Sequence, residues 1–238
     1  MLALKKVNQT VRTIRSFVRR EGKLTSGQKR ALDQSWPRYG MESYQGEFDV
    51  QQAFVQSAPI VLEIGFGNGA ALVSYAQQFP DLNWLGVEVH RPGIGHLLLQ
   101  LEKNQIENVR LVNDDAVEIL REMIPDQSLH GVHIFFPDPW PKKRHNKRRL
   151  VQSLFLDLVA SKLEVNGFLH IATDWQNYAE AIEHELERHW HLHLAHCIHD
   201  RSDMQSLESL HQRPITKFER RGLKLDHHVA DFVAIKSD

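Results

Sequence analysis

Apolar and polar positions along the chain follow a pattern that predicts strands alternating with helices. Short apolar runs, which predict strands, begin at Ile60 and recur at 84–89, 109–112, 131–136 and 168–173. Between them, segments with apolar residues at helical spacing occupy 70–79, 95–104, about 116–124, 147–163 and 178–190. Alternation of this kind predicts a mainly parallel sheet with helices packed on it.

Two further strand-like runs lie near the C-terminus, at 191–198 and 229–235. Between them we find a loop centred near Arg213 and no helical pattern, so they lack the crossover helix that parallel neighbours need. We expect these two strands to form an antiparallel edge. The predicted fold class is therefore α/β, a Rossmann-like, doubly wound, mostly parallel sheet with an antiparallel C-terminal edge.

The first 57 residues show no strand pattern and are predicted to form a basic N-terminal arm. A short amphipathic helix is predicted there by four apolar residues at helical spacing, Val7, Val11, Ile14 and Val18. The rest of the arm is interrupted by Gly22, Gly27, Pro37 and Gly40. We expect residues 1–57 to be partly flexible without a partner, and residues 58–238 to form the catalytic domain.

Charge is distributed unevenly although the net charge is only -1. Residues 1–38 carry ten Lys or Arg and two acids, a net charge of +8, so the remainder carries -9. A basic end of this kind favours a polyanionic partner. The single cysteine, Cys197, excludes an internal disulfide, and no apolar run approaches the ~18 residues of a membrane span. These features predict a cytoplasmic protein with no membrane partner.

The sequence around the first strand, I-V-L-E-I-G-F-G-N-G at 60–69, predicts a nucleotide site. A buried strand stops at a carboxylate, and three glycines then form a tight turn before a helix. Gly65, Gly67 and Ala70 fit the dinucleotide fingerprint G-x-G-x-x-G/A. Glu63, Gly65, Gly67 and Gly69 fit E-x-G-x-G-x-G equally well, which is similar to the first motif of class I S-adenosylmethionine methyltransferases. This stretch alone leaves both cofactors open.

An acid lies at or just after each of five predicted strands: Glu63, Glu88, Asp115, Asp138 and Asp174. Ligands of doubly wound sheets bind beyond the carboxyl ends of the strands, so these positions are candidate site residues. Glu88 can accept both ribose hydroxyls of either cofactor. Asp115 can accept from an adenine amino group, and Asp114 beside it is the candidate cap of the next helix.

The segment F-F-P-D-P-W-P-K-K-R-H-N-K-R-R at 135–149 carries the most information. Three prolines within five residues stiffen the loop after the fourth strand and hold Asp138 and Trp140 near the ligand. Six Lys or Arg follow within eight residues, without an acid. Such a charge beside a cofactor pocket would bring phosphates toward the reacting atom.

This segment resembles the signature of the bacterial tRNA (guanine-N7)-methyltransferase family. Further stretches resemble that family in the same order, namely V-L-E-I-G-F-G-N-G at 61–69, G-V-E-V-H at 86–90, N-D-D-A at 113–116, A-T-D-W at 172–175 and R-P-I-T-K-F-E at 213–219. The resemblance runs from about Arg38 to the C-terminus, and the arm matches in character only. It implies the class I methyltransferase fold and transfer of a methyl group from S-adenosylmethionine to N7 of a guanosine in the tRNA variable loop, guanosine 46.

The resemblance also implies roles for single residues. S-adenosylmethionine would be held by Glu63, Gly65, Gly67, Gly69, Glu88, Asp115 and Asp138. Asp138 would lie where cofactor and guanine meet and would be the catalytic residue. The substrate nucleotide would contact Lys142, Asp174, Thr216, Lys217, Phe218 and Glu219. The RNA backbone would contact the basic run Arg144, His145, Asn146, Lys147, Arg148 and Arg149. The partner would be tRNA, no metal would be needed, and the protein would be a monomer or homodimer.

Three other functions share part of this pattern. A NAD-dependent oxidoreductase has the glycine turn and an acid such as Glu88, but not P-D-P-W followed by a basic run. A methyltransferase that acts on an exocyclic amine has N/D-P-P-Y-type turns, which are similar to P-D-P-W. A non-catalytic RNA-binding module would need no acids at the strand ends. The histidines at 189, 191, 193, 196 and 199 are read as an exposed strand rather than as a metal site.

Overall fold

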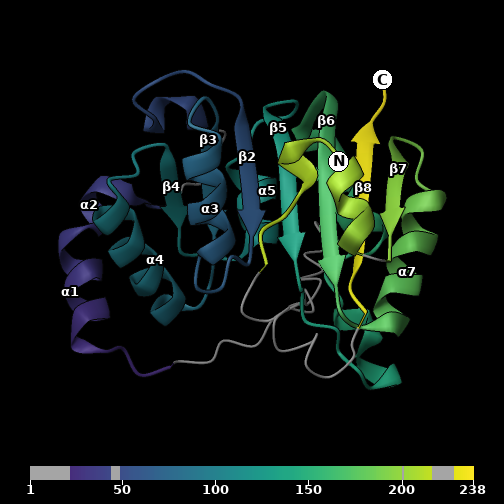
Figure 1. Cartoon of the computed structure of the whole chain (residues 1–238), viewed down its shortest axis with the longest axis horizontal. Coiled ribbons are helices and arrows are strands. Elements are labelled where there is room, and N and C mark those ends of the chain that lie inside the picture. The colour runs from purple at the N-terminus through teal and green to yellow at the C-terminus, as the bar shows by residue number, and fades with distance from the viewer. Residues whose placement is uncertain (1–21, 44–48, 200, 216–227) are drawn as a thin grey trace, which may run out of the picture.

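The computed structural model describes residues 22–43, 49–199, 201–215 and 228–238 (Figure 1). Within these ranges the chain forms one eight-stranded sheet. Its strands are β1 (Gly40–Met41), β2 (Ile60–Ile64), β3 (Asn83–Val87), β4 (Val109–Val112), β5 (Leu129–Phe135), β6 (Leu163–Thr173), β7 (Leu192–Ile198) and β8 (Ala230–Lys236). Their order across the sheet is β1-β4-β3-β2-β5-β6-β8-β7.

The strand directions confirm the predicted topology. β1 to β6 pair as parallel neighbours. β8 lies antiparallel between β6 and β7, so the last two strands form the expected antiparallel edge. Because β2 lies between β3 and β5, the chain reverses its direction of progress across the sheet at β2. This is the switch point where ligands of doubly wound sheets bind.

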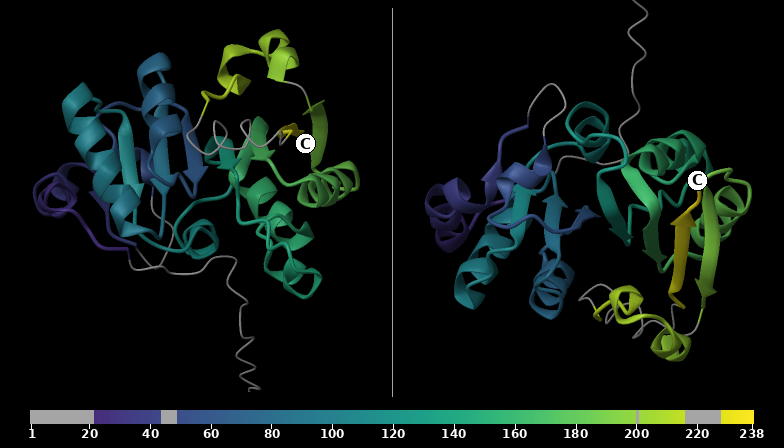
Figure 2. Two further views of the ribbon diagram at one scale, coloured as in Figure 1. Left: turned by 60° about the horizontal axis from the view of Figure 1, so that its bottom comes forward. Right: turned by 90° about the horizontal axis from the view of Figure 1, so that it is seen from above.

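Helices cover both faces of the sheet, as Figure 2 shows. They are α1 (Ser26–Gln34), α2 (Trp36–Tyr39), α3 (Ala70–Gln78), α4 (Arg91–Asn104), α5 (Ala116–Glu122), α6 (Ser153–Lys162) and α7 (Gln176–Glu187). Short 3₁₀ segments are η1 (Val50–Ala53), η2 (Lys143–Arg148), η3 (Arg201–Ser206) and η4 (Ser209–His211). None of the helices in the described ranges has both the length and the apolar character needed to cross a bilayer.

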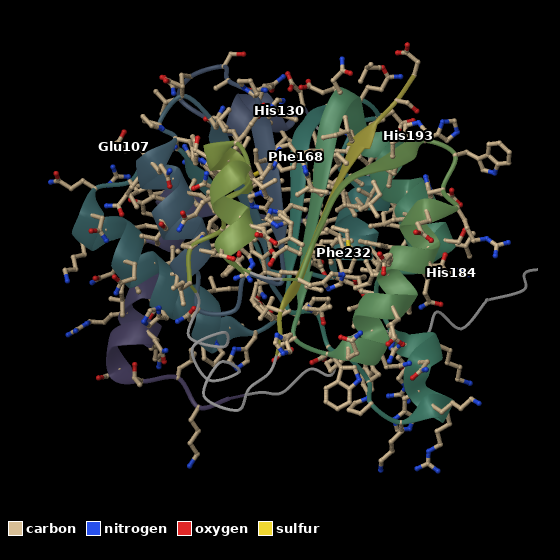
Figure 3. The ribbon with its side chains drawn as sticks, turned by 45° about the vertical axis from the view of Figure 1, so that its right-hand side comes forward. Glu107, His130, Phe168, His184, His193 and Phe232 are labelled. Carbon is tan, nitrogen blue, oxygen red and sulfur yellow. The ribbon has the colours of Figure 1, made fainter. Side chains whose placement is uncertain are left out.

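Two apolar cores lie on the two faces of the sheet. On one face, Leu120, Leu156 and Ile182 from α5, α6 and α7 pack in the core that contains Phe232 of β8. The other core contains Phe168 of β6 with residues of α3 and α4. Figure 3 shows both phenylalanines inside the molecule, while Glu107, His184 and His193 lie at its periphery. Every residue of β2 is buried, because helices cover that strand on both sides.

The N-terminal segment differs from the prediction. Thr25 and Gln28 form a reciprocal capping box that starts α1, and the side chain of Gln28 donates to the carbonyl of Pro92 at the start of α4 at 3.1 Å. Pro37 lies in the first turn of α2, where its missing N–H costs no helical bond. Gly40 pairs with β4. Gly27, Pro37 and Gly40, which were predicted to interrupt this segment, therefore lie within ordered elements. The amphipathic helix predicted at 7–18 lies outside the described residues.

Three predicted element boundaries are also wrong. The helix expected from 147 begins only at Ser153, because residues up to Arg148 form η2 and the chain is then extended. The strand expected from 168 begins at Leu163, immediately after α6, and passes through Asn166 with a left-handed φ of 66°. Asn tolerates that conformation better than most residues, so the Asn-Gly pair bends the strand without ending it. In addition, α4 begins at Arg91 rather than 95.

Candidate active site

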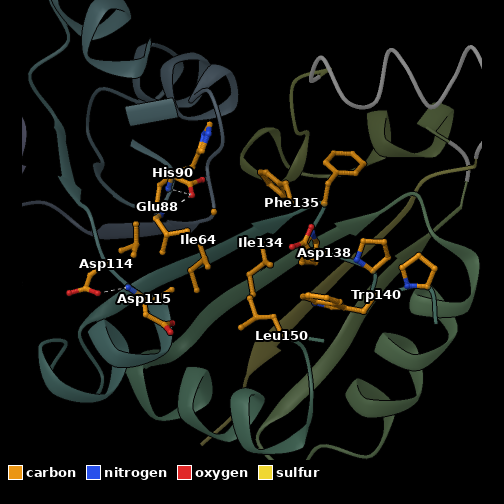
Figure 4. Close-up of a pocket in the computed structure, with 18 residues that line it drawn as sticks. Ile64, Glu88, His90, Asp114, Asp115, Ile134, Phe135, Asp138, Trp140 and Leu150 are labelled. Atoms are coloured by element: carbon orange, nitrogen blue, oxygen red, sulfur yellow. Dashed lines mark hydrogen bonds between the residues drawn. The ribbon is translucent and has the colours of Figure 1, made fainter. Parts of the chain in front are cut away.

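A cavity of about 680 Å³ opens beyond the carboxyl ends of β2, β3, β4 and β5. Its walls come from residues 64–65, 87–90, 114–116 and 134–141 and from Leu150. Figure 4 shows Glu88, Asp114 and Asp115 on one side, Asp138 and Trp140 on the other, and Ile64 and Ile134 between them. A volume of several hundred Å³ is the size range of cofactor sites. The cavity therefore brings together strand ends that are far apart in the sequence.

The glycine turn after β2 reaches the cavity through Gly65, whereas Gly67 and Gly69 are not among the lining residues. Gly65 has φ of 69°, and a Cβ built on it would meet no atom within 4 Å, so its backbone is open to a ligand. Gly69 has φ of 76° and forms the N-cap of α3, where a Cβ would lie only 2.6 Å from the Leu97 side chain. Both positions require glycine, one for conformation and access and the other for conformation and packing.

Glu88 holds this turn in place. The carboxylate is buried and accepts hydrogen bonds from the backbone N–H groups of Gly67 at 2.8 Å, Val89 at 2.8 Å and His90 at 2.9 Å. A carboxylate offers about four acceptor positions, so three backbone donors leave capacity for one further donor. Glu88 thus fixes the turn against β3 and still lines the cavity, as the sequence predicted for a ribose acceptor.

Glu63 lies deeper than the sequence led us to expect. It occupies the middle of β2, in register with Gly86 and His133, and it is not among the residues that line the cavity. Burial, followed by the nearby charge of Glu88, raises the pKa of Glu63 to about 8. The carboxyl is therefore mostly protonated at neutral pH. Its role in holding the cofactor stays a prediction.

Of the two acids after β4, the helix cap is not the one predicted, while the adenine contact predicted for Asp115 stays a prediction. Asp115, and not Asp114, is the N-cap of α5, because its Oδ1 accepts from the N–H of Val117 at 3.0 Å. Asp114 accepts from the N–H of Asp115 at 2.8 Å. Both residues line the cavity. The order of caps could not be read from the sequence, since either aspartate can cap a helix that starts at Ala116.

The loop after β5, residues 136–141, forms the opposite wall and carries Asp138. Phe136 has φ of 54° and Trp140 has φ of 45°, a conformation that is costly for residues with a side chain. All three prolines of this loop and Asp138 line the cavity. Asp138 is exposed, which leaves its carboxylate accessible to a ligand. Asp174, after β6, is half-buried and is not among the lining residues.

The basic run divides into an exposed and a buried part. Lys142, Lys143, Arg144 and Lys147 are exposed, His145 and Asn146 are half-buried, and the guanidinium of Arg148 lies 4.9 Å from the Trp140 ring. Arg149 is only 5% exposed and donates to the carbonyl of Pro139. The prediction that Arg149 contacts the RNA backbone is therefore wrong. Its neighbours in sequence give no sign of this, because burial depends on the loop that folds back over it.

The second predicted substrate segment is described only at its start. Thr216, Lys217, Phe218 and Glu219 lie outside the described residues. Arg213, just before them, is fully buried and forms a bidentate pair with Asp231 of β8, at 2.6 and 2.9 Å. Asp231 was not among the residues predicted for the site. The feature of the sequence that marks Asp231 is a charged residue near the start of an otherwise apolar strand.

Possible metal ligands gather at one place within the described part of the chain. Atoms of Glu183, Cys197 and His199 lie within 4.8 Å of one another, between α7 and the end of β7. None of the three lines the cavity. His189 instead bonds to Asp157 at 3.1 Å. The cavity and its walls thus hold carboxylates and backbone donors, which suit an organic cofactor.

Comparison with known sequences identifies relatives over nearly the whole chain. Residues 57–232 match a protein family described as "Putative methyltransferase". A tRNA (guanine-N(7)-)-methyltransferase of Alkalilimnicola ehrlichii is 51% identical over 228 residues, which cover 92% of this chain and 91% of that protein. The protein of the same name from Nitrosococcus oceani is 49% identical over 220 residues, covering 92% and 89%.

Solved structures share the fold at much lower identity. The 16S rRNA methyltransferase KamB has a TM-score of 0.58 at 14% identity and covers 84% of this chain and 99% of its own. A precorrin-6y C5,15-methyltransferase of Geobacter metallireducens has a TM-score of 0.50 at 18% identity, covering 76% and 83%. These likenesses confirm the predicted methyltransferase fold. With about half of its residues identical to such relatives over most of both sequences, this chain belongs to the tRNA (guanine-N(7)-)-methyltransferase family.

Proposed function

We propose that this protein transfers the methyl group of S-adenosylmethionine to N7 of a guanosine in tRNA. The observation that carries the proposal is the cavity itself, which joins Gly65, Glu88 and Asp115 on one wall to Asp138 on the other. The exposed cations of η2 follow directly from the Asp138 loop. The names of the relatives supply the reaction and the target atom.

The cavity fits the methyl donor chemically. Gly65 offers backbone without a side chain, Glu88 has capacity for one further donor such as a ribose hydroxyl, and Asp115 lies beside the apolar Ile134 and Leu150. Such a set suits a nucleoside with a polar sugar and a flat base. When bound, S-adenosylmethionine supplies a methyl group made electrophilic by a sulfonium centre. Glu63 would support this site from below rather than line it.

Methylation at N7 requires no proton transfer by the protein to create the nucleophile. Guanine N7 carries an in-plane lone pair and no proton, so no side chain has to act as a general base to create the nucleophile. The base becomes cationic as the new N–C bond forms. A carboxylate held near the base stabilises that charge, and a rigid loop keeps the base in line with the methyl group. Asp138, on a loop that three prolines stiffen, would take this role.

Guanine can be distinguished from adenine by carboxylates. Guanine presents N1–H and an amino group as adjacent donors, whereas adenine presents an acceptor at N1. Asp138 and Asp174, from neighbouring strand ends, would accept from these two donors. Trp140 would stack on the base. Lys142 and residues 216–219 would complete the substrate contacts that the family resemblance implies.

The backbone of the tRNA would lie along η2. Lys143, Arg144 and Lys147 are exposed on consecutive turns of this segment, with His145 and Asn146 between them. Exposed cations suit phosphates, since each phosphate contact releases condensed counterions. Arg148 would add to this surface while its guanidinium packs on Trp140. We propose guanosine 46 of the variable loop as the target, on the strength of the family resemblance.

We further propose that methyl transfer needs no metal, that the protein acts as a monomer or homodimer, and that it works in the cytoplasm, where bacterial tRNA is found. The division into a basic arm, residues 1–57, and a methyltransferase domain, residues 58–238, is kept as part of this proposal. The family match that starts at residue 57 supports it.

The function is tested by incubating the full chain with unmodified tRNA and S-adenosylmethionine labelled in its methyl group. The label is expected in 7-methylguanosine, detected by base-specific strand cleavage, at one site in the variable loop. Label in a different nucleoside would reject the target atom. Cleavage elsewhere in the tRNA would reject guanosine 46 while leaving the reaction class intact.

A further inference from the structure

We propose that two buried arginines, Arg149 and Arg213, are positioning residues that hold the Asp138 loop from both ends. This inference rests on the proposed function, because it assigns the loop its catalytic purpose. The loop, residues 136–141, contains two residues in the left-handed region, Phe136 and Trp140. Such a conformation persists only when its surroundings enforce it.

Arg149 holds the far end of the loop. Its Nε donates to the carbonyl of Pro139 at 2.9 Å. The other two nitrogens of the same guanidinium donate to the backbone carbonyl and the side-chain Oδ1 of Asn177, at 3.3 and 2.8 Å. The group also lies 4.7 Å from the ring centre of buried Tyr178. One planar group thus ties the loop to the first turn of α7.

The same hydrogen bond joins the two ends of the segment from Pro139 to Arg149, so that this segment forms a closed loop. Arg149 reaches back ten residues to Pro139, so everything between them, including η2, is fixed at both ends. Tyr178 contributes on the other side, since its hydroxyl accepts from the N–H of Val151 at 3.0 Å. Arg149 is buried, but it therefore fixes the position of the exposed cations of η2 relative to Asp138.

Arg213 holds the near end of the loop. Its guanidinium lies 5.1 Å from the ring centre of Phe136, the residue just before Pro137 and Asp138. Asp231 fixes the guanidinium in two bonds, and Oδ1 of Asp231 also bonds to Nε2 of His170 at 3.0 Å. Phe136 is further pinned by its own N–H, which donates to the carbonyl of Ala172.

Lysine could not replace either group. Each arginine uses several donors in one plane and also stacks on an aromatic ring, which an ammonium cannot do. A loop displaced by 1 Å can lose 10²-fold in rate, because in-line attack tolerates little misplacement. Arg149 and Arg213, the two clamps of the loop, should therefore affect the rate of methyl transfer rather than the affinity for RNA.

The decisive variant is Arg149→Met, which removes charge and hydrogen bonds but keeps an apolar stem. At saturating tRNA and S-adenosylmethionine we expect the single-turnover rate to fall by about 10- to 100-fold. The log–log salt slope of tRNA binding should stay unchanged, and the amide hydrogens of Asp138 and Trp140 should exchange faster. The matched neighbour Lys147→Met should lower the salt slope by about one and raise KM for tRNA.

Two further variants separate positioning from stability. Phe136→Leu removes the ring that Arg213 packs on and leaves the Arg213–Asp231 pair in place, so it tests the second clamp without unpairing a buried charge. Its single-turnover rate should fall and the exchange of Asp138 should rise. Lys162→Met breaks the pair with Asp126 at the amino end of β5. It should lower the melting temperature and leave the rate and the exchange of Asp138 as in the original protein.

Three results would overturn the proposal. The first is a salt slope that falls by about one in Arg149→Met, with exchange unchanged, because that is the behaviour of a phosphate contact. The second is a lower melting temperature in Arg149→Met with the rate and exchange unaltered. The third is a Phe136→Leu variant whose rate and exchange do not change. If the original protein methylates no tRNA, the proposed function fails, and the exchange measurements still test the clamps independently.

Discussion

Replacing Glu63 by Gln should remove a penalty that the folded protein carries above mildly acidic pH. Glu63 is 2% exposed in the middle of β2, and its Oε2 has no hydrogen-bond partner among the described residues. Burial and the neighbouring Glu88 raise its pKa to about 8, from 4.5. The folded chain therefore retains a proton that the unfolded chain releases. Stability contributed by this group is full below the unfolded value and is lost as pH rises toward 8.

The size of the effect follows from the two pKa values. Each unit of difference corresponds to about 1.4 kcal/mol, so a difference of about 3.5 units corresponds to about 5 kcal/mol over the whole range. Between pH 5 and 7.5 the loss amounts to about 3 kcal/mol, because part of the titration lies outside that window. Gln has nearly the same shape and does not titrate. The gain in stability of Glu63→Gln over the original should therefore grow by about 3 kcal/mol across this window.

Urea unfolding followed by circular dichroism at pH 5, 6, 7 and 7.5, without cofactor, measures this difference. The buried His133 and His211 give the opposite slope, since burial lowers their pKa values and their contribution is lost as pH falls below about 6.5. That contribution is common to both proteins and cancels in the difference. The m-values must agree for the comparison to hold. A gap between the two proteins that is constant with pH would refute the reasoning.

Three further predictions concern the site. Asp138→Asn should lower kcat by about 10²-fold or more, the scale for losing one key electrostatic group, and an unchanged single-turnover rate would remove that role. Glu88→Ala should weaken S-adenosylmethionine binding in calorimetry by at least about 10-fold, because three backbone donors lose their acceptor and the glycine turn is no longer fixed. Neutralising Lys143, Arg144 and Lys147 together should flatten the log–log salt slope of tRNA binding by roughly 2–3 units, and an unaltered slope would take η2 off the contact surface.

The parts of the fold that the sequence predicts well are those set by local pattern. Residues 109–112 were expected as a strand and form β4, because three of the four residues are apolar and buried, and only Arg110 is half-buried. The helix expected at 70–79 forms α3 at Ala70–Gln78, since a glycine turn precedes it and Pro80 follows. The antiparallel edge followed from the missing crossover helix. Each of these depends on residues close together in the chain.

The parts that the sequence did not predict depend on contacts between distant residues. Arg149 sits in a run of cations, and only the return of the chain to Pro139 and Asn177 shows that it is buried. Arg213 and Asp231 are 18 positions apart and meet because β8 inserts between β6 and β7. Residues 26–41 looked like an interrupted arm because their packing partner, α4, comes more than fifty residues later. Pattern alone does not encode such pairs.

The candidate site was predicted in outline and corrected in detail. Glu88, Asp115 and Asp138 were each expected at the carboxyl end of a strand, and the structure places all three on one cavity. Glu63 also lies near the carboxyl end of a strand, but its side chain is buried and does not line the cavity. Side chains alternate between the two faces of a sheet along a strand, so position near the strand end does not by itself bring an acid to the ligand. The rule identifies which end of the sheet to inspect, and the side-chain direction then decides which acids reach the ligand.

Whether the cavity is a methyl-transfer site is decided by single-turnover transfer from labelled S-adenosylmethionine to unmodified tRNA, with the product mapped by cleavage at 7-methylguanosine. We expect one labelled guanosine in the variable loop, and a rate in the Asp138→Asn variant that is lower by about 10²-fold or more. Transfer to a nitrogen other than N7, or an equal rate in that variant, would contradict it.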